Sequence, residues 1–466
     1  MVICAISRPH GVDDAHHSLR NRTVMRFVDL CAGLGGFRQA LTRLGYECVF
    51  ASEIDDELRE LYVENYPDAV GTTFGDLRLF RNRVPPHNIL CAGFPCQPFS
   101  KSGSQLGLDD AIRGTLFDEI AHILERCHPE YVILENVGNF ERHDGGRTWN
   151  IVKQKLQALG YDVRGTEHIV SGGPGLISPH HFGFPHSRER FFIVAKLGQL
   201  PVNPFPSGDR DCETDLGEMV QPAHELTSDD MQETRLTESQ RDCIEHWNLL
   251  LSKLPESDVP LPSFPIWSDE FGATYPFESH TPYYTTTTEL RRYLNGHANG
   301  TRLAHYELME LLPSYARSTS EKFPKWKVNF IRQNREWYRE YCRFFPRNWL
   351  ATLRTFPSSF RKLEWNCQGE ERNLWRHVLQ FRPSGLRVKR YSTAPALVAM
   401  TATQIPILGP KRRFVTRIEG LRLQGFPDHH KLPRSRELAF QALGNAVHVG
   451  LVEIIARQLL RDSLYG

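Results

Sequence analysis

Short apolar strands alternate with amphipathic helical segments over the first 200 residues. Runs rich in β-branched or aromatic residues occur at 26–31, 47–53, 88–93, 131–136 and 191–197, and segments with helical spacing of apolar residues occur at 36–44, 55–65, 115–127 and 148–159. This alternation predicts βαβ units, and therefore a mostly parallel sheet with helices on both faces.

The alternation is lost after residue 200. Pro-rich, acidic and irregular sequence follows, then a basic block, and no internal repeat is evident. The stretch 436–462 is predicted to be one long helix that Gly444 and Asn445 interrupt.

Composition indicates an ordinary globular protein. Of 466 residues, 40% are hydrophobic and 24% are charged, which is enough for two or three domains and excludes a fully disordered, collagen-like or coiled-coil chain. No uninterrupted apolar run of about 18 residues and no secretion signal is present, so we expect neither export nor membrane insertion. The ten cysteines form no C-x-x-C pair, so we expect reduced thiols and no metal site.

The net charge of +1 hides two opposite segments. Residues 201–280 hold 17 Asp and Glu against 4 Lys and Arg, whereas 322–417 hold 21 Lys and Arg against 5 Asp and Glu. The basic block is interleaved with aromatic residues, which suits a nucleic-acid groove. A solvated basic face over an aromatic core is the alternative, and charge alone does not separate the two.

A glycine turn follows the first strand at 31–36. Its spacing departs from the G-x-G-x-x-G fingerprint because Arg38 takes the third glycine position, so a pyrophosphate ligand is not favoured. Glu53 ends the second strand, where a carboxylate can accept hydrogen bonds from ribose hydroxyls, and Asp76 could bind an adenine amino group. A nucleoside site is one interpretation of this pattern and an ordinary turn is the other.

Reactive side chains lie at the ends of three further strands. Cys96 comes after the strand 88–93, either as a presented thiol or as a structural cysteine in a Pro-rich turn, whereas Cys91 is expected to be buried. Glu135 emerges from four apolar residues and can share a proton with a ligand, and it lies near Cys96 only if the strands 88–93 and 131–136 are neighbours. Arg188 and Arg190 alternate at a strand start, where both guanidinium groups can point to one side.

The ordered set of motifs resembles the DNA (cytosine-5)-methyltransferases of bacterial restriction-modification type. The motifs are Asp29–Phe37, Gly93–Ser100, Arg113–Phe117, Glu135–Val137, Arg188–Arg190, Leu423–Pro427 and Gly444–Val447. The resemblance covers about 22–197 and 410–466, and the part between them falls where the family keeps its variable target-recognition domain.

The resemblance implies an α/β fold: a Rossmann-like S-adenosylmethionine-dependent methyltransferase domain, with a large, irregular target-recognition domain inserted before the C-terminal helix. The expected parts are an N-terminal extension 1–24, a catalytic domain 25–199, a target-recognition region 200–405 and a C-terminal segment 406–466 that returns to the catalytic domain. The target-recognition region has an acidic part 201–280, for which the sequence suggests no role, and a basic part 322–405.

The resemblance also implies the chemistry. Cys96 would add to C6 of a cytosine flipped out of duplex DNA, so that C5 becomes nucleophilic. Glu135 would bind N3 and the exocyclic amine, Arg190 would hold O2, and Arg188 would support the active-site loop and the DNA backbone. S-adenosyl-L-methionine would donate the methyl group and leave as S-adenosyl-L-homocysteine.

The implied cofactor residues surround the glycine turn and the adjoining strand ends. They are Cys31, Ala32, Gly33, Leu34, Gly35, Gly36, Glu53, Ile54, Asp76, Leu77, Pro95, Leu116, Asn445 and Ala446. The implied DNA-binding residues are Ser100, Ser102 and Arg113 in a mobile loop at 97–113, and Arg382, Arg387, Lys389 and Arg390 in the basic block. The last four could read guanine or contact phosphates only, and the segment 393–397 is a further candidate for target recognition.

Several residues depart from the family pattern. His186 stands where Gln is common, Ile418 where Arg is common, and Phe440 and Ala442 where Tyr and Gln are common. These departures concern local packing and phosphate contacts rather than the chemistry.

The expected partner is double-stranded DNA, and a cognate restriction endonuclease would act on the same site without a stable complex. A cytoplasmic monomer without a metal or a membrane is expected. A transfer-RNA cytosine methyltransferase is one alternative, although the roughly 185 residues between 200 and 385 favour duplex DNA. A catalytically inactive DNA-binding homologue is the other alternative.

Overall fold

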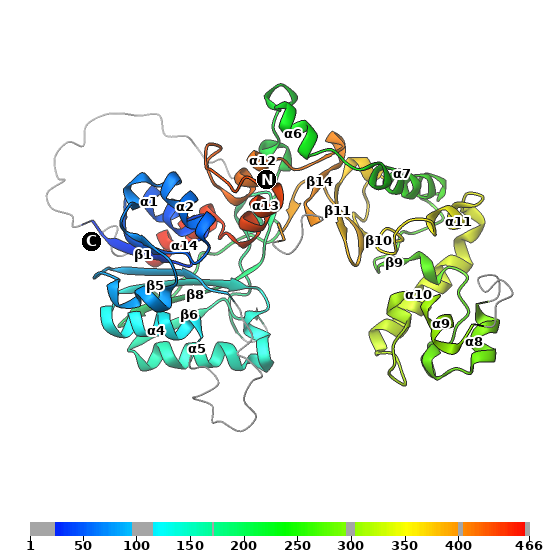
Figure 1. Ribbon diagram of the computed structural model, residues 1–466, viewed down its shortest axis with the longest axis horizontal. Coiled ribbons are helices and arrows are strands. Elements are labelled where there is room, and N and C mark those ends of the chain that lie inside the picture. The colour runs from blue at the N-terminus through cyan, green and yellow to red at the C-terminus, as the bar shows by residue number, and fades with distance from the viewer. Residues whose placement is uncertain (1–23, 96–114, 170–171, 295–302, 399–403, 462–466) are drawn as a thin grey trace.

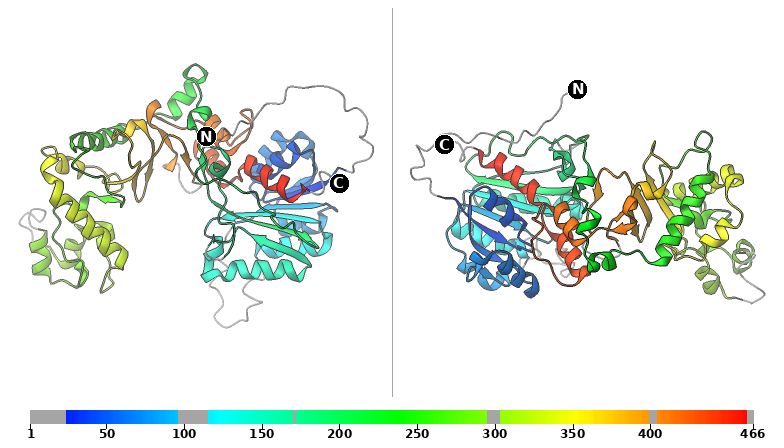
Figure 2. Two further views of the ribbon diagram at one scale, coloured as in Figure 1. Left: turned by 180° about the vertical axis from the view of Figure 1, so that it is seen from behind. Right: turned by 90° about the horizontal axis from the view of Figure 1, so that it is seen from above.

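The computed structural model describes residues 24–95, 115–169, 172–294, 303–398 and 404–461. Figure 1 shows an α/β domain on one side and, joined to it, a second sheet that carries a group of helices at its far end. The two parts correspond to the segments before and after residue 200, except that the last helices return to the α/β domain (Figure 2).

The α/β domain is built on a seven-stranded sheet with strand order β3-β2-β1-β4-β5-β8-β6. The strands are β1 (Arg26–Leu30), β2 (Glu47–Ser52), β3 (Thr73–Phe74), β4 (Ile89–Gly93), β5 (Tyr131–Val137), β6 (Tyr161–Gly165) and β8 (Arg190–Leu197). Only β8 runs in the direction opposite to the other six strands, so the predicted mostly parallel sheet is confirmed. The strands β3 and β6 are too short or too mixed in polarity to stand out in the sequence.

Helices cover both faces of this sheet, as the alternation predicts. Alternate strand residues such as Phe27 and Ile133 pack with α1 (Gly36–Arg43) and α14 (Val449–Leu459). The residues between them, such as Val28 and Leu134, pack with α4 (Leu116–Cys127) and α5 (Arg147–Ala158) on the other face. The helices α2 (Asp56–Asn65) and α3 (Leu77–Phe80) follow β2 and β3.

The predicted single helix at 436–462 is wrong, because two helices form there, α13 (Arg436–Asn445) and α14. Ala446 is extended, and the His448 side chain accepts the N–H of Leu451 at 3.1 Å, which starts a new helix. By length and composition, Arg436–Leu459 could span a membrane, the one such stretch found among the described residues. It is mostly buried, as core helices are.

The second part of the molecule contains a six-stranded sheet, called here the second sheet, with order β15-β14-β11-β12-β10-β9. Its strands are β9 (Ile266–Trp267), β10 (Lys362–Asn366), β11 (Val378–Arg382), β12 (Gly385–Lys389), β14 (Ile407–Leu408) and β15 (Arg413–Phe414). The sheet therefore continues past the boundary expected at 405. The helices α6 (Ser228–Glu233) and α7 (Glu238–Lys253) precede it, and α12 (Arg417–Gln424) follows it.

A helical insert occupies residues 268–361, between β9 and β10. It contains α8 (Thr287–Tyr293), α9 (His305–Glu310), α10 (Lys325–Tyr341) and α11 (Trp349–Leu353). Part of the insert has its own core, which includes Tyr275, Leu290, Leu308 and Ile331. Its α11 packs on α7 through Trp349, whose indole meets that of Trp247 edge to face.

Candidate active site

The carboxyl ends of β4 and β5 lie side by side, and Gly93 pairs in register with Glu135. Cys96 can approach Glu135 only if these two strands are neighbours, and they are. Position 96 comes three residues after Gly93. Cys96 itself lies outside the described residues. Cys91 is fully buried within β4, as expected.

Glu135 and Arg190 form an ion pair at this edge. Arg190 begins β8, next to β5 in the sheet, and its Nε lies 2.9 Å from Glu135 Oε1. The N–H does not point well at that oxygen, so neither atom has an aligned hydrogen bond. The Glu135 side chain is only 9% exposed and the Arg190 side chain 16%. The Glu135 carboxylate is thus a partly desolvated hydrogen-bond acceptor beside the Arg190 cation. Both side chains can still form hydrogen bonds with a ligand.

Asn136 positions the backbone that leads from β4 toward Cys96. Its buried side-chain amide donates to the carbonyl of Phe94 at 2.9 Å, and its oxygen accepts the N–H of Val137. Sequence reasoning gave Asn136 no role of its own. Its place directly after Glu135, at the end of an apolar strand, is the signal that could have pointed to it.

Arg188 is enclosed inside the protein. It is 2% exposed, and its guanidinium donates to the carbonyls of Gly444 at 2.9 Å and Ala446 at 2.7 Å. Burial, with the nearby Arg190, lowers the pKa of Arg188 to about 9, so it stays charged at neutral pH. A direct contact with the DNA backbone is not open to a side chain buried in this way. Arg188 instead ties β8 to the C-terminal segment.

The glycine turn has the unusual backbone that its residues suggest. Cys31, Gly33 and Gly35 all have positive φ, at 55°, 53° and 80°. A Cβ on Gly36 would lie 2.6 Å from the Val447 side chain, so the turn and the C-terminal segment approach too closely for any other residue. Gly33, in contrast, faces open space.

Glu53 is held at the turn by backbone donors. Its Oε2 accepts the N–H of Gly33 at 2.7 Å, and its Oε1 accepts the N–H of Asp55 at 3.0 Å. Each carboxylate oxygen has a second lone pair, so the fixed side chain can still accept from a diol. The expected role of Glu53 therefore fits its geometry.

The other expected cofactor residues border this turn. Ile54 is 63% exposed beside Glu53, as a side chain that packs on a ligand would be, and Leu77 is buried below Asp76. Asp76 caps α3 by accepting the N–H of Arg78 at 3.0 Å. Asn445 is exposed and Ala446 is buried at the end of α13, whereas Pro95 and Leu116 lie at the two ends of the segment that is not described. These residues fit a nucleoside with an apolar ring face.

His186 and the segment 393–397 meet beside the arginines. His186 is fully buried and pairs with Ala394, because β7 (His186–Ser187) and β13 (Ala394–Pro395) form a two-stranded sheet. Burial lowers the pKa of His186 well below its usual value, so the ring is neutral. The structure thus brings this candidate recognition segment within a few residues of Arg190.

Three of the four expected DNA-reading cations of the second sheet approach glutamates of the same chain. Arg387 binds Glu364 at 2.8 Å, Arg382 lies 3.9 Å from the same carboxylate, and Arg390 binds Glu370 at 3.0 Å. Burial lowers the pKa of Lys389. Ser100, Ser102 and Arg113 lie outside the described residues.

The acidic segment has a structural partner that the sequence did not reveal. Glu233 and Glu225 approach Arg417 and Arg422 of α12, at 2.8 and 3.8 Å. Farther along, Glu270 binds Arg335 of α10 at 2.9 Å. Part of the acidic segment therefore neutralises cations that follow it in the chain. Among the described residues, no cluster of His, Cys, Asp or Glu is suited to a metal ion.

Comparison with known proteins gives consistent matches. The family model of C-5 cytosine-specific DNA methylases matches residues 25–461. The type II methyltransferase M.AluI of Cellulosimicrobium cellulans is 33% identical over 500 aligned positions, covering 93% of this chain and 92% of that protein. The type II methyltransferase M.HhaI of Haemophilus parahaemolyticus is 40% identical, but over 39% of this chain and 52% of its own length.

Proposed function

Since the chain belongs to the C-5 cytosine-specific DNA methylases and is a DNA cytosine-5-methyltransferase, we propose that it methylates a flipped-out cytosine through Cys96 and the Glu135–Arg190 pair. The observation that carries this assignment is the register of Gly93 with Glu135 at the sheet edge. It brings the segment that leads to Cys96 beside a carboxylate with an arginine partner.

The proposed reaction uses the thiolate of Cys96 to activate the ring. The sulfur adds to C6, and the electrons move to C5, which then takes the methyl group. Glu135 binds N3 and the exocyclic amine, and Arg190 binds O2, so that charge developing on the ring meets fixed partners. The proton then leaves C5 and the C6–sulfur bond breaks, which restores the aromatic ring and the thiolate.

The proposed methyl donor is S-adenosyl-L-methionine, which supplies an electrophilic methyl group and leaves as S-adenosyl-L-homocysteine. Glu53 would bind the ribose hydroxyls, and Ile54 would cover one face of the adenine. The backbone at Gly33 would approach the methionine part, since nothing lies within 4 Å of the position of its missing Cβ.

The proposed context is a restriction-modification system. Relatives named as type II methyltransferases support it, and the M.AluI match spans the target-recognition region as well as the catalytic domain. The enzyme would act as a cytoplasmic monomer on double-stranded DNA. A cognate endonuclease would recognise the same site without forming a stable complex.

The direct test measures transfer of a labelled methyl group from S-adenosyl-L-methionine to DNA and, separately, to transfer RNA. Wild type should label duplex DNA, and Cys96→Ala should lose transfer. Cys342→Ala removes an exposed thiol of the helical insert and serves as the matched control. Bisulfite sequencing of DNA from expressing cells identifies the sequence and the modified base.

The alternatives give different results in the same assay. Label in transfer RNA but not in DNA would indicate a transfer-RNA methyltransferase. Binding of DNA without any transfer by wild type would indicate an inactive homologue. Transfer retained by Cys96→Ala would overturn the assignment of the nucleophile.

A further inference from the structure

The longest helix of the insert, α10, carries a line of cations. Lys325, Arg332 and Arg339 are seven residues apart, which places them on one face, and Arg343 extends this line just after the helix. The opposite face is buried through Ile331, Asn334 and Trp337. Two acidic residues, Glu336 and Glu340, lie beside these cations. The segment 322–361 as a whole has 10 Lys and Arg against 2 Asp and Glu.

Three cations of this stripe differ from those of the second sheet. Lys325, Arg339 and Arg343 are exposed and have no acidic partner within 4.0 Å among the described residues, whereas Arg332 is paired with Glu278 at 2.9 Å. In the second sheet, Arg382, Arg387 and Arg390 all approach glutamates. The uncompensated positive charge of the basic block therefore gathers on the insert.

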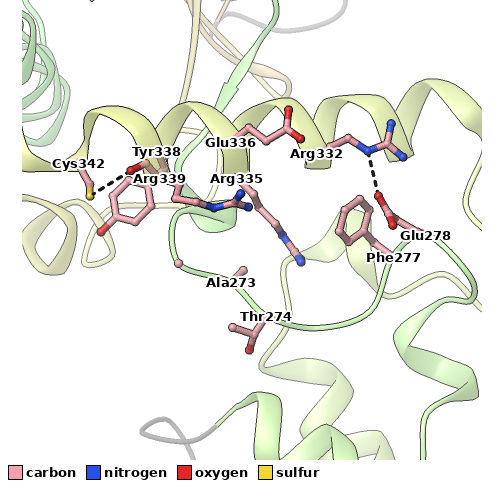
Figure 3. A pocket seen from close by; sticks show the side chains of 11 residues that line it. Ala273, Thr274, Phe277, Glu278, Arg332, Arg335, Glu336, Tyr338, Arg339 and Cys342 are labelled. Atoms are coloured by element: carbon pink, nitrogen blue, oxygen red, sulfur yellow. Dashed lines mark hydrogen bonds and ion pairs between the residues drawn. The ribbon is translucent and has the colours of Figure 1, made fainter.

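The helix lies beside an open hollow of about 580 Å³, between α10 and the loop 272–278. Figure 3 shows Arg332, Arg335 and Arg339 along α10 above that loop. Arg335 fixes the loop by binding Glu270 at 2.9 Å and the Tyr275 carbonyl at 3.0 Å, and its guanidinium packs on the Tyr275 ring. Arg339 borders the hollow without such a partner.

The position of α10 suits a contact with a long polyanion. Figures 1 and 2 show α10 on the side of the insert toward the α/β domain, with the second sheet joining the two. A helix of 17 residues is about 25 Å long, which matches the rise of about seven base pairs of duplex. Exposed cations without acidic partners bind phosphates by releasing counterions, whatever the base sequence.

We propose that the exposed stripe Lys325, Arg339 and Arg343 binds the phosphate backbone of duplex DNA outside the methylated site. This inference rests on the proposed function, because it takes the duplex to be the substrate. The insert then lengthens the contact with DNA and adds affinity without reading sequence. Base recognition and catalysis stay with the rest of the protein.

The test compares wild type with the triple variant Lys325→Ala, Arg339→Ala and Arg343→Ala. The matched control is Arg147→Ala, Arg164→Ala and Arg457→Ala, which removes the same charge from exposed sites on the α/β domain. The affinities for a short duplex that barely exceeds the methylated site and for a long duplex are measured from 50 to 200 mM salt. Thermal unfolding of each variant checks that the insert remains folded.

The stripe variant should bind the long duplex more weakly and lose the preference for it over the short one. Its plot of log affinity against log salt should be shallower by up to about 2.7, which is about 0.9 for each lost phosphate contact. Over this range the wild-type affinity then falls by up to about 40-fold more. Methyl transfer at saturating DNA should be unchanged, and Arg339→Lys with Arg343→Lys should restore the affinity.

Two results would overturn the proposal. One is a stripe variant with the length preference and salt slope of wild type, and the other is an equal loss in the control variant, which would indicate a general charge effect. Wild-type protein that transfers no methyl group to DNA would instead contradict the proposed function.

Discussion

The edge of the seven-stranded sheet and the second sheet with its insert use charge in different ways. At the first, the charged groups are few and nearly buried, and each is fixed by a close partner, as Glu53 is by two backbone N–H groups and Arg188 by two carbonyls. In the second, cations are numerous and of two kinds. Arg382, Arg387 and Arg390 of the sheet approach glutamates. On the insert, Lys325, Arg339 and Arg343 are exposed.

The difference indicates two kinds of task. A reacting ring needs partners that are already in place, because their reorganisation would add to the barrier. A surface that holds DNA needs cations that can exchange one anion for another. An arginine paired with a glutamate can exchange the carboxylate for a phosphate or a base, at modest cost when the pair is exposed.

Glu135→Gln tests the fixed edge and should have the largest effect. The amide keeps the shape but loses the charge that faces Arg190 and the developing charge on the ring. We expect methyl transfer in a single turnover to slow by about 10²- to 10⁴-fold. Glu130→Gln, an exposed acid at the start of the same strand, is the control. Equal rates for both variants would remove Glu135 from the chemistry.

Arg188→Met tests whether the edge depends on the C-terminal segment. The change leaves the buried carbonyls of Gly444 and Ala446 without donors, so the free energy of unfolding should fall by about 3 kcal/mol. Urea unfolding measures this loss, and Arg188→Lys should recover part of it. If the variant unfolds like wild type but binds DNA weakly, Arg188 contacts the DNA backbone and the structural role is wrong.

His448→Asn tests the same junction through pH. Burial lowers the pKa of His448 to about 3, and its ring caps α14 as an acceptor. Below the unfolded pKa near 6.5 only the unfolded state takes the proton, so stability present above pH 6.5 is lost as the pH falls toward 3. Asn keeps the cap without titrating.

The stability of wild type relative to His448→Asn should therefore fall by about 1.4 kcal/mol per pH unit between pH 6 and 4. Urea titrations at several pH values give this difference. Burial raises the pKa of Asp29 to about 7, so its protonation stabilises the folded state as the pH falls. Asp29 is present in both proteins, so its contribution cancels in the difference between their stabilities. A constant difference would mean that His448 accepts a proton in the folded state.

Glu364→Gln tests the exchangeable pairs and should have the smallest effect. It frees Arg387 and Arg382, so DNA of any sequence should bind a few-fold more tightly, with a salt slope steeper by about 0.9 to 1.8. Arg387→Ala is the companion variant. It should relax the sequence preference if Arg387 reads a base, and weaken binding to all sequences equally if it contacts a phosphate.

The sequence predicted the fold of the α/β domain well because local patterns determine it. The strands 88–93 and 131–136 and the glycine turn are visible as apolar runs and residue types, and each helix between them has its own periodicity. The expected neighbourhood of Gly93 and Glu135 then follows from the usual order of such sheets.

Contacts between distant segments could not be predicted in this way. The bonds from Arg188 to Gly444 and Ala446 cross more than 250 residues, and the pair Glu233–Arg417 crosses 184. Neither leaves a local signal, so the acidic segment had no visible role. The second sheet was hidden for a similar reason, since β9, β14 and β15 have two residues each.

The contact of Gly36 with Val447 joins a segment that is synthesised early to one that is synthesised late. The strands β1 to β8 leave the ribosome first, whereas α14, which covers α1, comes more than 230 residues after β8. At about 5 to 20 residues synthesised per second, this is a delay on the order of 10 to 50 s. During that time α1 covers one apolar face of the sheet without α14, and the glycine turn lacks its contact with Val447. We therefore expect newly made chains to pass through a state in which this face is partly exposed, so that chaperones can bind it before the cofactor turn is complete.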